Sequence, residues 1–457
     1  MMQLLNKIAE YAEQQGSQIA LDFDGKQLTY AQLQAEINRA RQPISKLESN
    51  NIVALTMQQP LLLIVNYLAV LSEGNIPCVC DFRWTNKQRK EILAHYQIPY
   101  VMDDKLTVIT TGYSQPDTYD NTELQLLHIG FTSGTTGLPK AYYRDEPSWI
   151  NSYVENEKLL TTTISTILAP GPLSHSLSLY ACIYALYSGR TFIGQQTFSA
   201  ALFIDQITAV QQQVALFLVP TMLIACLTGH QQLNGQHFIF SSGDKLAPHI
   251  REKVSRMFPK AIVVEFFGTS EASFISYNYN NQAPTNSVGK LFDNVFVRFD
   301  NQDHDQIGTL NINSNMVFSG YVDQGFQQDE WIRTGDFASM DDAGYLYLHG
   351  REHDRLIIGG RNVYPSEVEE AIKGTGWFDE VLVIGQAHPK FGEIAILLYK
   401  APTSIDYIDL KRYLSQQIPR YQIPSKLIRV EQFEYTASGK IARHKMKQWY
   451  RESGDKG

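Results

Sequence analysis

The chain has 457 residues, with 47 Asp and Glu against 39 Lys and Arg. That length is more than one simple hydrophobic core holds, so we expect two or three subdomains. A hydrophobic content of 44% and a charged content of 19% are ordinary for a globular protein, and the acidic excess argues against a nucleic-acid-binding protein.

The first fifteen residues predict an amphipathic helix with glutamates inside it, so we do not expect a signal peptide there. The longest apolar runs, 61–71 and 214–227, are too short to span a bilayer, which leaves peripheral membrane contact open. The four cysteines lack zinc-type spacing, so we expect reduced thiols in a cytoplasmic protein. They are Cys78, Cys80, Cys182 and Cys226.

Helices and strands alternate along the first hundred residues. The expected elements are a helix from Thr29 to about Arg41, a strand over 52–57, a helix over 60–74, a strand over 77–80, a helix over 85–96 and a strand over 100–102. Thr29 and Gln32 form a capping box at the start of the first of these helices. Such alternation predicts a parallel sheet with helices on its faces.

A loop rich in glycine and hydroxyl groups follows the next strand. The apolar run 126–131 leads into Thr132-Ser-Gly-Thr-Thr-Gly-Leu-Pro-Lys140. Glycines allow close approach of a ligand, hydroxyls and amides donate to anionic oxygens, and the lysine adds a positive charge. A strand followed by such a loop is typical of phosphate binding, although the residue order is not that of a Walker A loop. A polar surface turn is the alternative.

The alternation resumes after this loop and changes character near residue 289. The expected elements are strands over 166–169, 191–193, 216–219, 238–241 and 262–266, with helices over 176–188, 200–212 and 248–258. Short strands and turns over about 289–350 predict a small β subdomain. A charged junction follows at 351–355. Residues 356–457 predict a compact α+β domain, in which Ser366 and Glu369 form a capping box.

Residues 132–140 resemble the phosphate-binding loop of the adenylate-forming superfamily, which comprises acyl- and aryl-CoA ligases, peptide-synthetase adenylation domains and beetle luciferase. Ala141 replaces the glycine that usually follows the lysine. The resemblance implies an α/β fold: a large amino-terminal domain over 1–350 with parallel or mixed sheets and flanking helices, a hinge at 351–355, and a small mobile α+β domain. It assigns nucleotide binding to Thr132, Ser133, Gly134, Thr135, Thr136, Gly137 and Lys140.

Two later segments extend the resemblance to the adenine and metal sites. Residues 241–245 resemble the glycine segment that lies along the adenine, and residues 265–271 resemble an aromatic-Gly-x-Thr-Glu motif. The implied nucleotide-binding residues are Gly243, Asp244, Lys245, Glu265 at the adenine amino group, Phe267 stacked on the adenine, Gly268, and Ser270 at the phosphates. Glu271 is the implied Mg²⁺ ligand, because Mg²⁺ prefers carboxylate and phosphate oxygen.

The resemblance also implies an acyl pocket, lined by His175, Ser242 and Thr269. Adenylation domains that activate amino acids usually place an aspartate near the position of His175, where it pairs with the α-ammonium group. No aspartate stands between Ala169 and Arg190. We therefore expect a carboxylic acid without an amino group.

The carboxy-terminal motifs complete the expected site. The implied roles are ribose binding by Asp336, a nucleotide contact by Arg351, the hinge at His353 where Asp or Lys is usual, passage of the pantetheine arm beside Gly359 and Gly360, and catalysis by Lys440. Thr132 and Glu271 are the other catalytic candidates. Glu434 replaces a proline that usually precedes the lysine loop.

Taken together, these motifs predict ATP-dependent activation of a fatty or aryl acid to an acyl-adenylate, followed by thioester formation with CoA and release of AMP and pyrophosphate. The expected cofactors are ATP, Mg²⁺ and CoA as co-substrate. A ligase that loads a phosphopantetheinyl carrier protein is one alternative. A non-catalytic nucleotide-binding paralogue is another, because Ala141, Asp244, His353 and Glu434 depart from the family pattern. The sequence leaves the acid and the oligomeric state open.

Overall fold

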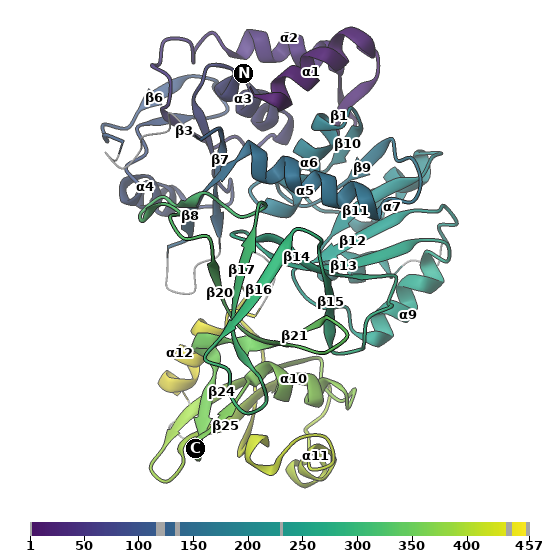
Figure 1. The fold of residues 1–457 in the computed structure, drawn as a ribbon, viewed down its shortest axis with the longest axis vertical. Helices are drawn as coiled ribbons and strands as arrows, with labels where there is room; N and C mark the ends of the chain where they lie inside the picture. The colour runs from purple at the N-terminus through teal and green to yellow at the C-terminus, as the bar shows by residue number, and fades with distance from the viewer. Residues whose placement is uncertain (1, 116–123, 133–137, 229–231, 436–440, 454–457) are drawn as a thin grey trace. The chain divides into compact units, whose positions relative to one another are not determined.

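Figure 1 shows the chain as a computed structural model, which describes residues 2–115, 124–132, 138–228, 232–435 and 441–453. The chain forms two compact units. The first unit contains the residues up to Thr132, Leu138–Phe296 and Asn313–Ile332, and the second contains Val297–Ile312 and the residues from Arg333 onward. None of the helices in the described ranges has the length and apolarity that a bilayer crossing requires.

The amino-terminal part of the first unit follows the predicted alternation. Its elements are α1 (Gln3–Gln14), β1 (Ile19–Phe23), β2 (Lys26–Thr29), α2 (Tyr30–Ala40), β3 (Ile52–Leu55), α3 (Pro60–Ser72), β4 (Ile76–Val79), α4 (Asn86–His95), β5 (Tyr100–Met102) and β6 (Val108–Thr110). The capping box at Thr29 and Gln32 is confirmed, with both reciprocal hydrogen bonds formed. A second capping box, at Thr85 and Gln88, starts α4.

Two sheets organise the first unit. One has the strand order β15-β14-β13-β12-β11-β9-β10-β1-β2, and the other has the order β19-β18-β8-β7-β4-β3-β5-β6. Neighbours from β13 to β1, and β5 to β7 through β3 and β4, pair in parallel, so the parallel prediction is confirmed. The other bounds are β7 (Leu126–Thr132), β8 (Lys140–Asp145), β9 (Thr166–Leu168), β10 (Thr191–Gly194), β11 (Val214–Leu218), β12 (Phe238–Ser242), β13 (Ile262–Thr269), β14 (Ser273–Tyr279), β15 (Ser287–Leu291), β18 (Gly320–Tyr321) and β19 (Gly325–Phe326).

Helix α3 lies between these two sheets, because it contacts β1 of one sheet and β3 and β4 of the other. Nine consecutive residues of the helix, 63–71, are buried, as expected for a helix that is apolar on all sides. Helix α6 (Ser176–Tyr187) packs on β9, β10 and β11, beside α5 (Glu146–Leu159) (Figure 1). Helices α7 (Ala200–Ala209), α8 (Pro220–Cys226) and α9 (Pro248–Met257) contribute to a further core over the same sheet.

The second unit contains a set of β strands and a small α+β segment. Strands β16 (Val295–Asp300), β17 (Gly308–Ser314), β20 (Ile332–Met340) and β21 (Tyr345–Arg351) are neighbours in that order. A five-stranded sheet then has the order β23-β22-β25-β24 with β26 beside β25. Its elements are β22 (Leu356–Ile358), β23 (Arg361–Val363), β24 (Glu380–His388), β25 (Gly392–Lys400) and β26 (Lys426–Arg429), with α10 (Pro365–Lys373), α11 (Tyr407–Leu414) and α12 (Arg443–Ser453).

The capping box predicted at Ser366 and Glu369 is wrong. Helix α10 begins two residues earlier than that box implies, at Pro365, and no side chain caps it. Proline is favoured at the first helical position because its missing N–H has no partner there in any case. Ser366 therefore lies inside the first turn, and its hydroxyl donates to the carbonyl of His349 at 2.5 Å.

Candidate active site

The site starts at the carboxyl end of β7, the strand that leads into the predicted phosphate loop. Thr132 is the last residue of β7 and pairs with Lys140, the first residue of the antiparallel strand β8. The intervening candidates Ser133, Gly134, Thr135, Thr136 and Gly137 lie outside the described residues, as does Lys440. The described part of the hairpin places Thr132 and Lys140 opposite each other at the base of the loop.

A short turn after β13 holds Glu271 close to this hairpin. The hydroxyl of Tyr321 donates to Glu271 Oε1 at 2.6 Å. Lys140 Nζ lies 5.1 Å from the centroid of the same tyrosine ring, a cation–π distance. Tyr321 pairs with Tyr142 of β8. The metal candidate and the lysine of the phosphate loop are thus joined through one side chain, Tyr321, that the motifs did not indicate.

The chemistry of Glu271 fits a magnesium ligand. Among the described residues, its second carboxylate oxygen, Oε2, has no hydrogen-bond partner. A half-buried carboxylate with one oxygen held and the other available suits a hard cation that also keeps phosphate oxygens. Ser270, the residue before it, and Thr269 at the end of β13 complete the turn, and Thr269 Oγ1 accepts from the N–H of Ala272 at 3.0 Å.

Gly268, inside the β13–β14 hairpin, has a packing reason for being glycine. A Cβ atom there would lie 2.0 Å from the carbonyl oxygen of Ser273, which no side chain tolerates. The ladder shifts register between Phe267 and Gly268, and Phe267 is half-buried. The turn of this hairpin therefore carries Ser270 and Glu271, and Phe267 lies on β13 a few residues before that turn.

The adenine candidates have protein partners in this structure. Glu265 is buried, accepts from the N–H of Leu246 at 2.8 Å, and forms an ion pair with Arg251. Burial raises the pKa of Glu265, and Arg251 opposes that rise. The N–H of Lys245 donates to Asp244 Oδ1 at 2.8 Å, and Lys245 Nζ donates to the carbonyl of Thr285. Gly243 is exposed, beyond Ser242 at the end of β12.

His175 precedes α6 and is held by an arginine that sequence reasoning missed. Arg83 Nη2 lies 2.8 Å from Nε2 of His175. Arginine can only donate, so Nε2 accepts and the imidazole is neutral with its proton on Nδ1. Burial and the guanidinium both lower the pKa of His175. Arg83 Nε donates to both carboxylate oxygens of Asp81, at 2.9 and 3.1 Å. Burial alone would raise the pKa of Asp81, but the hydrogen bonds from Arg83 outweigh burial and lower that pKa.

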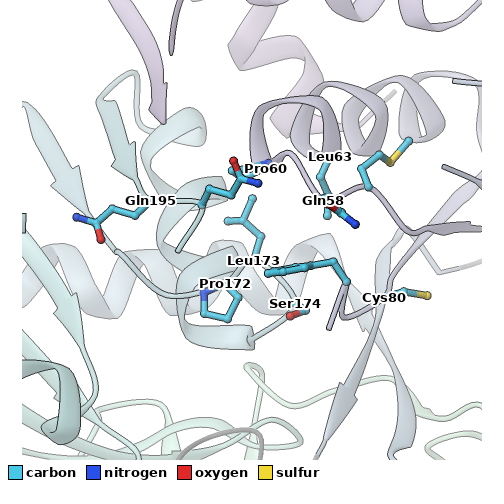
Figure 2. A pocket seen from close by; sticks show the side chains of 11 residues that line it. Gln58, Pro60, Leu63, Cys80, Pro172, Leu173, Ser174 and Gln195 are labelled. Carbon is cyan, nitrogen blue, oxygen red and sulfur yellow. The ribbon is translucent and has the colours of Figure 1, made fainter. Parts of the chain in front are cut away.

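A small cleft adjoins this cluster (Figure 2). It lies beyond the carboxyl ends of β3, β4 and β10 and beside the loop that leads into His175. Its walls are mainly apolar, with glutamines at the edge, and the lining residues include Met57, Gln58, Pro60, Leu63, Cys80, Phe82, Pro172, Leu173, Ser174, Gln195 and Gln196. Position at strand ends is typical of ligand sites in open α/β sheets.

The second unit carries the ribose and hinge candidates. Asp336 of β20 is buried, is paired with Arg351 of β21, and lies 3.0 Å (Oδ1) from Nε of Arg351. Arg351 also donates to the carbonyl of Thr334 at 3.0 Å. His353 is exposed in a short 3₁₀ turn, Glu352–Asp354.

Asp354, the residue after His353, forms ion pairs with two basic residues of α12, Lys447 at 3.0 Å and Arg443 at 3.1 Å. Gly359 and Gly360 are exposed and have φ of 60° and 76°, left-handed values that favour glycine.

Comparison with known proteins agrees with these motifs. The AMP-binding enzyme family model matches residues 8–322. The protein named "Putative long chain fatty acid-CoA ligase VraA" in Staphylococcus haemolyticus is 46% identical, with 100% of both chains covered. "Uncharacterized acyl--CoA ligase YhfT" of Bacillus subtilis is 27% identical, with 99% of both chains covered.

Solved structures share the fold. The o-succinylbenzoate CoA synthetase MenE of Bacillus subtilis, in complex with its acyl-adenylate intermediate, superposes with a TM-score of 0.84 at 20% identity, over 97% of this chain and 98% of that one. ATP-bound MatB of Rhodopseudomonas palustris gives 0.83 at 20% identity, over 99% of both chains. The predicted α/β fold is confirmed, and the chain belongs to the AMP-binding enzyme family, in its acyl-CoA ligase branch.

Proposed function

We propose that this ligase activates a fatty acid to its acyl-adenylate through the residues assembled around Glu271, and then transfers the acyl group to CoA. The observation that carries this assignment is the linked group of Lys140, Tyr321 and Glu271 at the strand ends of the first unit. It offers a cation from the phosphate loop and an available carboxylate oxygen for Mg²⁺. Attack of a carboxylate on the α-phosphate brings two anions together, so charge neutralisation is the main requirement.

Each residue has a proposed role in the first half-reaction. The backbone and hydroxyls of 132–137, with Lys140, bind the β- and γ-phosphates that leave as pyrophosphate. Glu271 would hold Mg²⁺, which neutralises the phosphates when it is bound. Ser270 contacts phosphate, Asp336 binds the ribose hydroxyls, and Arg351 contacts the nucleotide.

Lys440 approaches the reacting carboxylate and α-phosphate, and the domain that carries it turns about His353 before CoA attacks. The division into domains at 351–355 is part of the same proposal.

The adenine contacts remain a proposal too, with one modification. Glu265 is engaged by Arg251 and the N–H of Leu246, so it supports the adenine edge by fixing the 243–246 segment rather than by offering a free carboxylate. Phe267 and Gly243 are left as the proposed stacking surfaces.

A fatty acid is the favoured substrate for two reasons. His175 is neutral because Arg83 donates to it, so it adds no charge to the pocket that it lines with Ser242 and Thr269. The VraA proteins of several staphylococci, which are 44–46% identical to this chain, are named as putative long chain fatty acid-CoA ligases. An aryl acid is the second candidate, because the MenE structure is that of an o-succinylbenzoate CoA synthetase with its acyl-adenylate intermediate, OSB-AMP.

Pyrophosphate release from a panel of carboxylic acids tests this function. Fatty acids of increasing length, benzoate-type acids and amino acids are each supplied with ATP and Mg²⁺, with and without CoA. Acid-dependent pyrophosphate release, with AMP released to solution only when CoA is present, supports the proposal. Turnover with a phosphopantetheinyl carrier protein and none with CoA would favour the carrier-protein alternative. ATP binding without pyrophosphate release for any acid would favour a non-catalytic paralogue.

A further inference from the structure

Arg144 of β8 is the bulkiest fully buried side chain in the described part of the chain, with 2% of its surface exposed. Burial lowers the pKa of its guanidinium, although a guanidinium remains charged in proteins. Among the described residues, no carboxylate lies within ion-pair distance of it. A buried charge without a paired carboxylate is costly, and an apolar side chain of similar volume would stabilise the fold better. Its presence therefore calls for another reason.

The hydrogen bonds of Arg144 supply that reason. Nη2 donates to the carbonyl of Ser270, and Nη1 donates to the carbonyl of Met316 at 2.8 Å and to Ser148 Oγ at 3.3 Å. Ser270 immediately precedes Glu271. One guanidinium therefore joins β8, which begins at Lys140, to the turn that carries the metal candidate.

The segment around Met316 is tied to the same turn. The N–H of Phe318 donates to the carbonyl of Glu271 at 2.6 Å, and Tyr321 further along donates to the Glu271 carboxylate. Ser319 anchors the segment on β8, through its N–H to the carbonyl of Tyr143 at 3.0 Å and its hydroxyl to Asp145 at 2.6 Å. Arg144 thus fixes both the backbone before Glu271 and the segment that orients its side chain.

We propose that Arg144 is a positioning residue for Glu271: its buried guanidinium holds the Ser270–Glu271 turn at the height where the carboxylate reaches a metal ion bound to ATP. The inference rests on the proposed role of Glu271 and adds a residue that no motif marks. Arg144 is itself buried and is not among the residues proposed to contact nucleotide or acid. Its loss displaces the metal ligand without removing any group from the site.

The test compares Arg144→Met with Arg190→Met as the matched control. Arg190 is also largely buried, with 14% of its side chain exposed, and it too donates to a backbone carbonyl, that of Ile164 at 2.8 Å. Arg190 pairs with Glu157 beside α6 and has no contact with the Glu271 turn. Both variants should lower the midpoint of thermal unfolding, so a shared loss of stability is accounted for by the control.

The decisive readout is Mn²⁺ binding in the presence of ATP, followed by electron paramagnetic resonance without acid or CoA. For Arg144→Met we expect the Kd of Mn²⁺ to rise at least tenfold, about 1.4 kcal/mol, while the affinity for ATP with EDTA changes less than twofold. Arg190→Met should bind Mn²⁺ as the wild type does. If Arg144→Met is too unstable to purify, Arg144→Lys keeps the charge but loses the planar fork, and the same direction of change is expected.

Wild-type Mn²⁺ affinity in a folded Arg144 variant would overturn the inference, as would an equal loss in Arg190→Met. Failure of the proposed function has a different signature. In that case the wild type binds Mn²⁺ and ATP but releases no pyrophosphate with any acid, and the comparison of metal affinities between variants still decides the role of Arg144.

Discussion

Arg83 and His175, 92 residues apart in sequence, are joined by a hydrogen bond of 2.8 Å in which the guanidinium donates to Nε2 of the imidazole. This bond fixes the tautomer of His175. Together with burial it also lowers the pKa of the imidazole. At neutral pH the imidazole of His175 is therefore uncharged, at the amino-terminal end of α6.

We predict that Arg83→Met makes acid binding sensitive to mild acidification. Loss of the guanidinium removes one positive neighbour and leaves Asp81 unpaired beside the ring, so the pKa of His175 rises. A charged ring disfavours an apolar acyl chain. The KM for a fatty acid should then increase as pH falls from 8 to 6, and this increase should begin at a higher pH in the variant than in the wild type. The KM for ATP, measured over the same pH range, is the internal reference.

The control for this experiment is Arg39→Met, which removes an exposed arginine that pairs with Glu36 on α2. Its pH profile should match that of the wild type. Identical profiles for Arg83→Met and the wild type would show that the arginine does not control the charge of His175.

His128 predicts a loss of stability on the acid side. Burial, with the charge of Arg144 beside it, lowers the pKa of this histidine to about 3, against about 6.5 in an unfolded chain. The unfolded chain therefore binds a proton that the folded state does not, below pH 6.5. The contribution of neutral His128 to the free energy of unfolding is fully present above pH 6.5 and is lost as pH drops towards 3. Between pH 7.5 and 5.5 the loss is about 1.4 kcal/mol.

His128→Gln should flatten this acid limb, measured as the shift of the urea unfolding midpoint between pH 7.5 and 5.5. His249→Gln, which replaces an exposed histidine on α9, should keep the wild-type shift. An unchanged shift in His128→Gln would mean that other groups cause the acid sensitivity.

The Arg251–Glu265 pair predicts strong non-additivity. The two side chains are 15% and 11% exposed, so removal of one partner leaves a largely buried charge. Arg251→Met should destabilise the protein by about 3 kcal/mol, at the low end of the range for broken buried pairs. The double variant Arg251→Met/Glu265→Gln should recover much of that loss. Additive losses, measured by urea unfolding of Arg251→Met, Glu265→Gln and the double variant, would contradict a coupled pair.

Lys440→Ala should block the first half-reaction and spare the second. We expect ATP–pyrophosphate exchange to fall at least roughly 100-fold, about 2.7 kcal/mol or more, while thioester formation from a supplied acyl-adenylate stays within about threefold. Lys445→Ala, on α12 nearby in sequence, is the control and should retain both activities. Exchange at the wild-type rate in Lys440→Ala would refute the role of this lysine.

The sequence predicted the parallel strands well because their signal is local. The apolar runs of β3, β4 and β9, and the capped helix α2, follow from burial and capping within a few residues. Strand length was predicted less well. β13 extends to Thr269 rather than ending near 266, because an antiparallel partner, β14, continues its hydrogen-bonding ladder, and that pairing has no local signature.

The motif residues were also recognisable from sequence, whereas their supporting residues were not. None of Arg83, Arg144 and Tyr321 was among the predicted site residues, and each acts on a residue fifty or more positions away. Arg144 follows Ala141-Tyr-Tyr in β8, which also contains Lys140 and Asp145, so no local signal separated it from a surface arginine. In the sequence Arg83, two residues after Asp81, is expected to form a surface ion pair, and only the fold shows that it also contacts His175.

Acid-dependent pyrophosphate release by the purified wild-type chain, with ATP and Mg²⁺ in the presence and absence of CoA, tests the central claim most directly. We predict release with a fatty acid, AMP in solution only when CoA is added, and loss of both in Glu271→Gln at low Mg²⁺. Tight binding of ATP with no pyrophosphate release across fatty, aryl and amino acids would contradict the assignment as an acid-activating ligase.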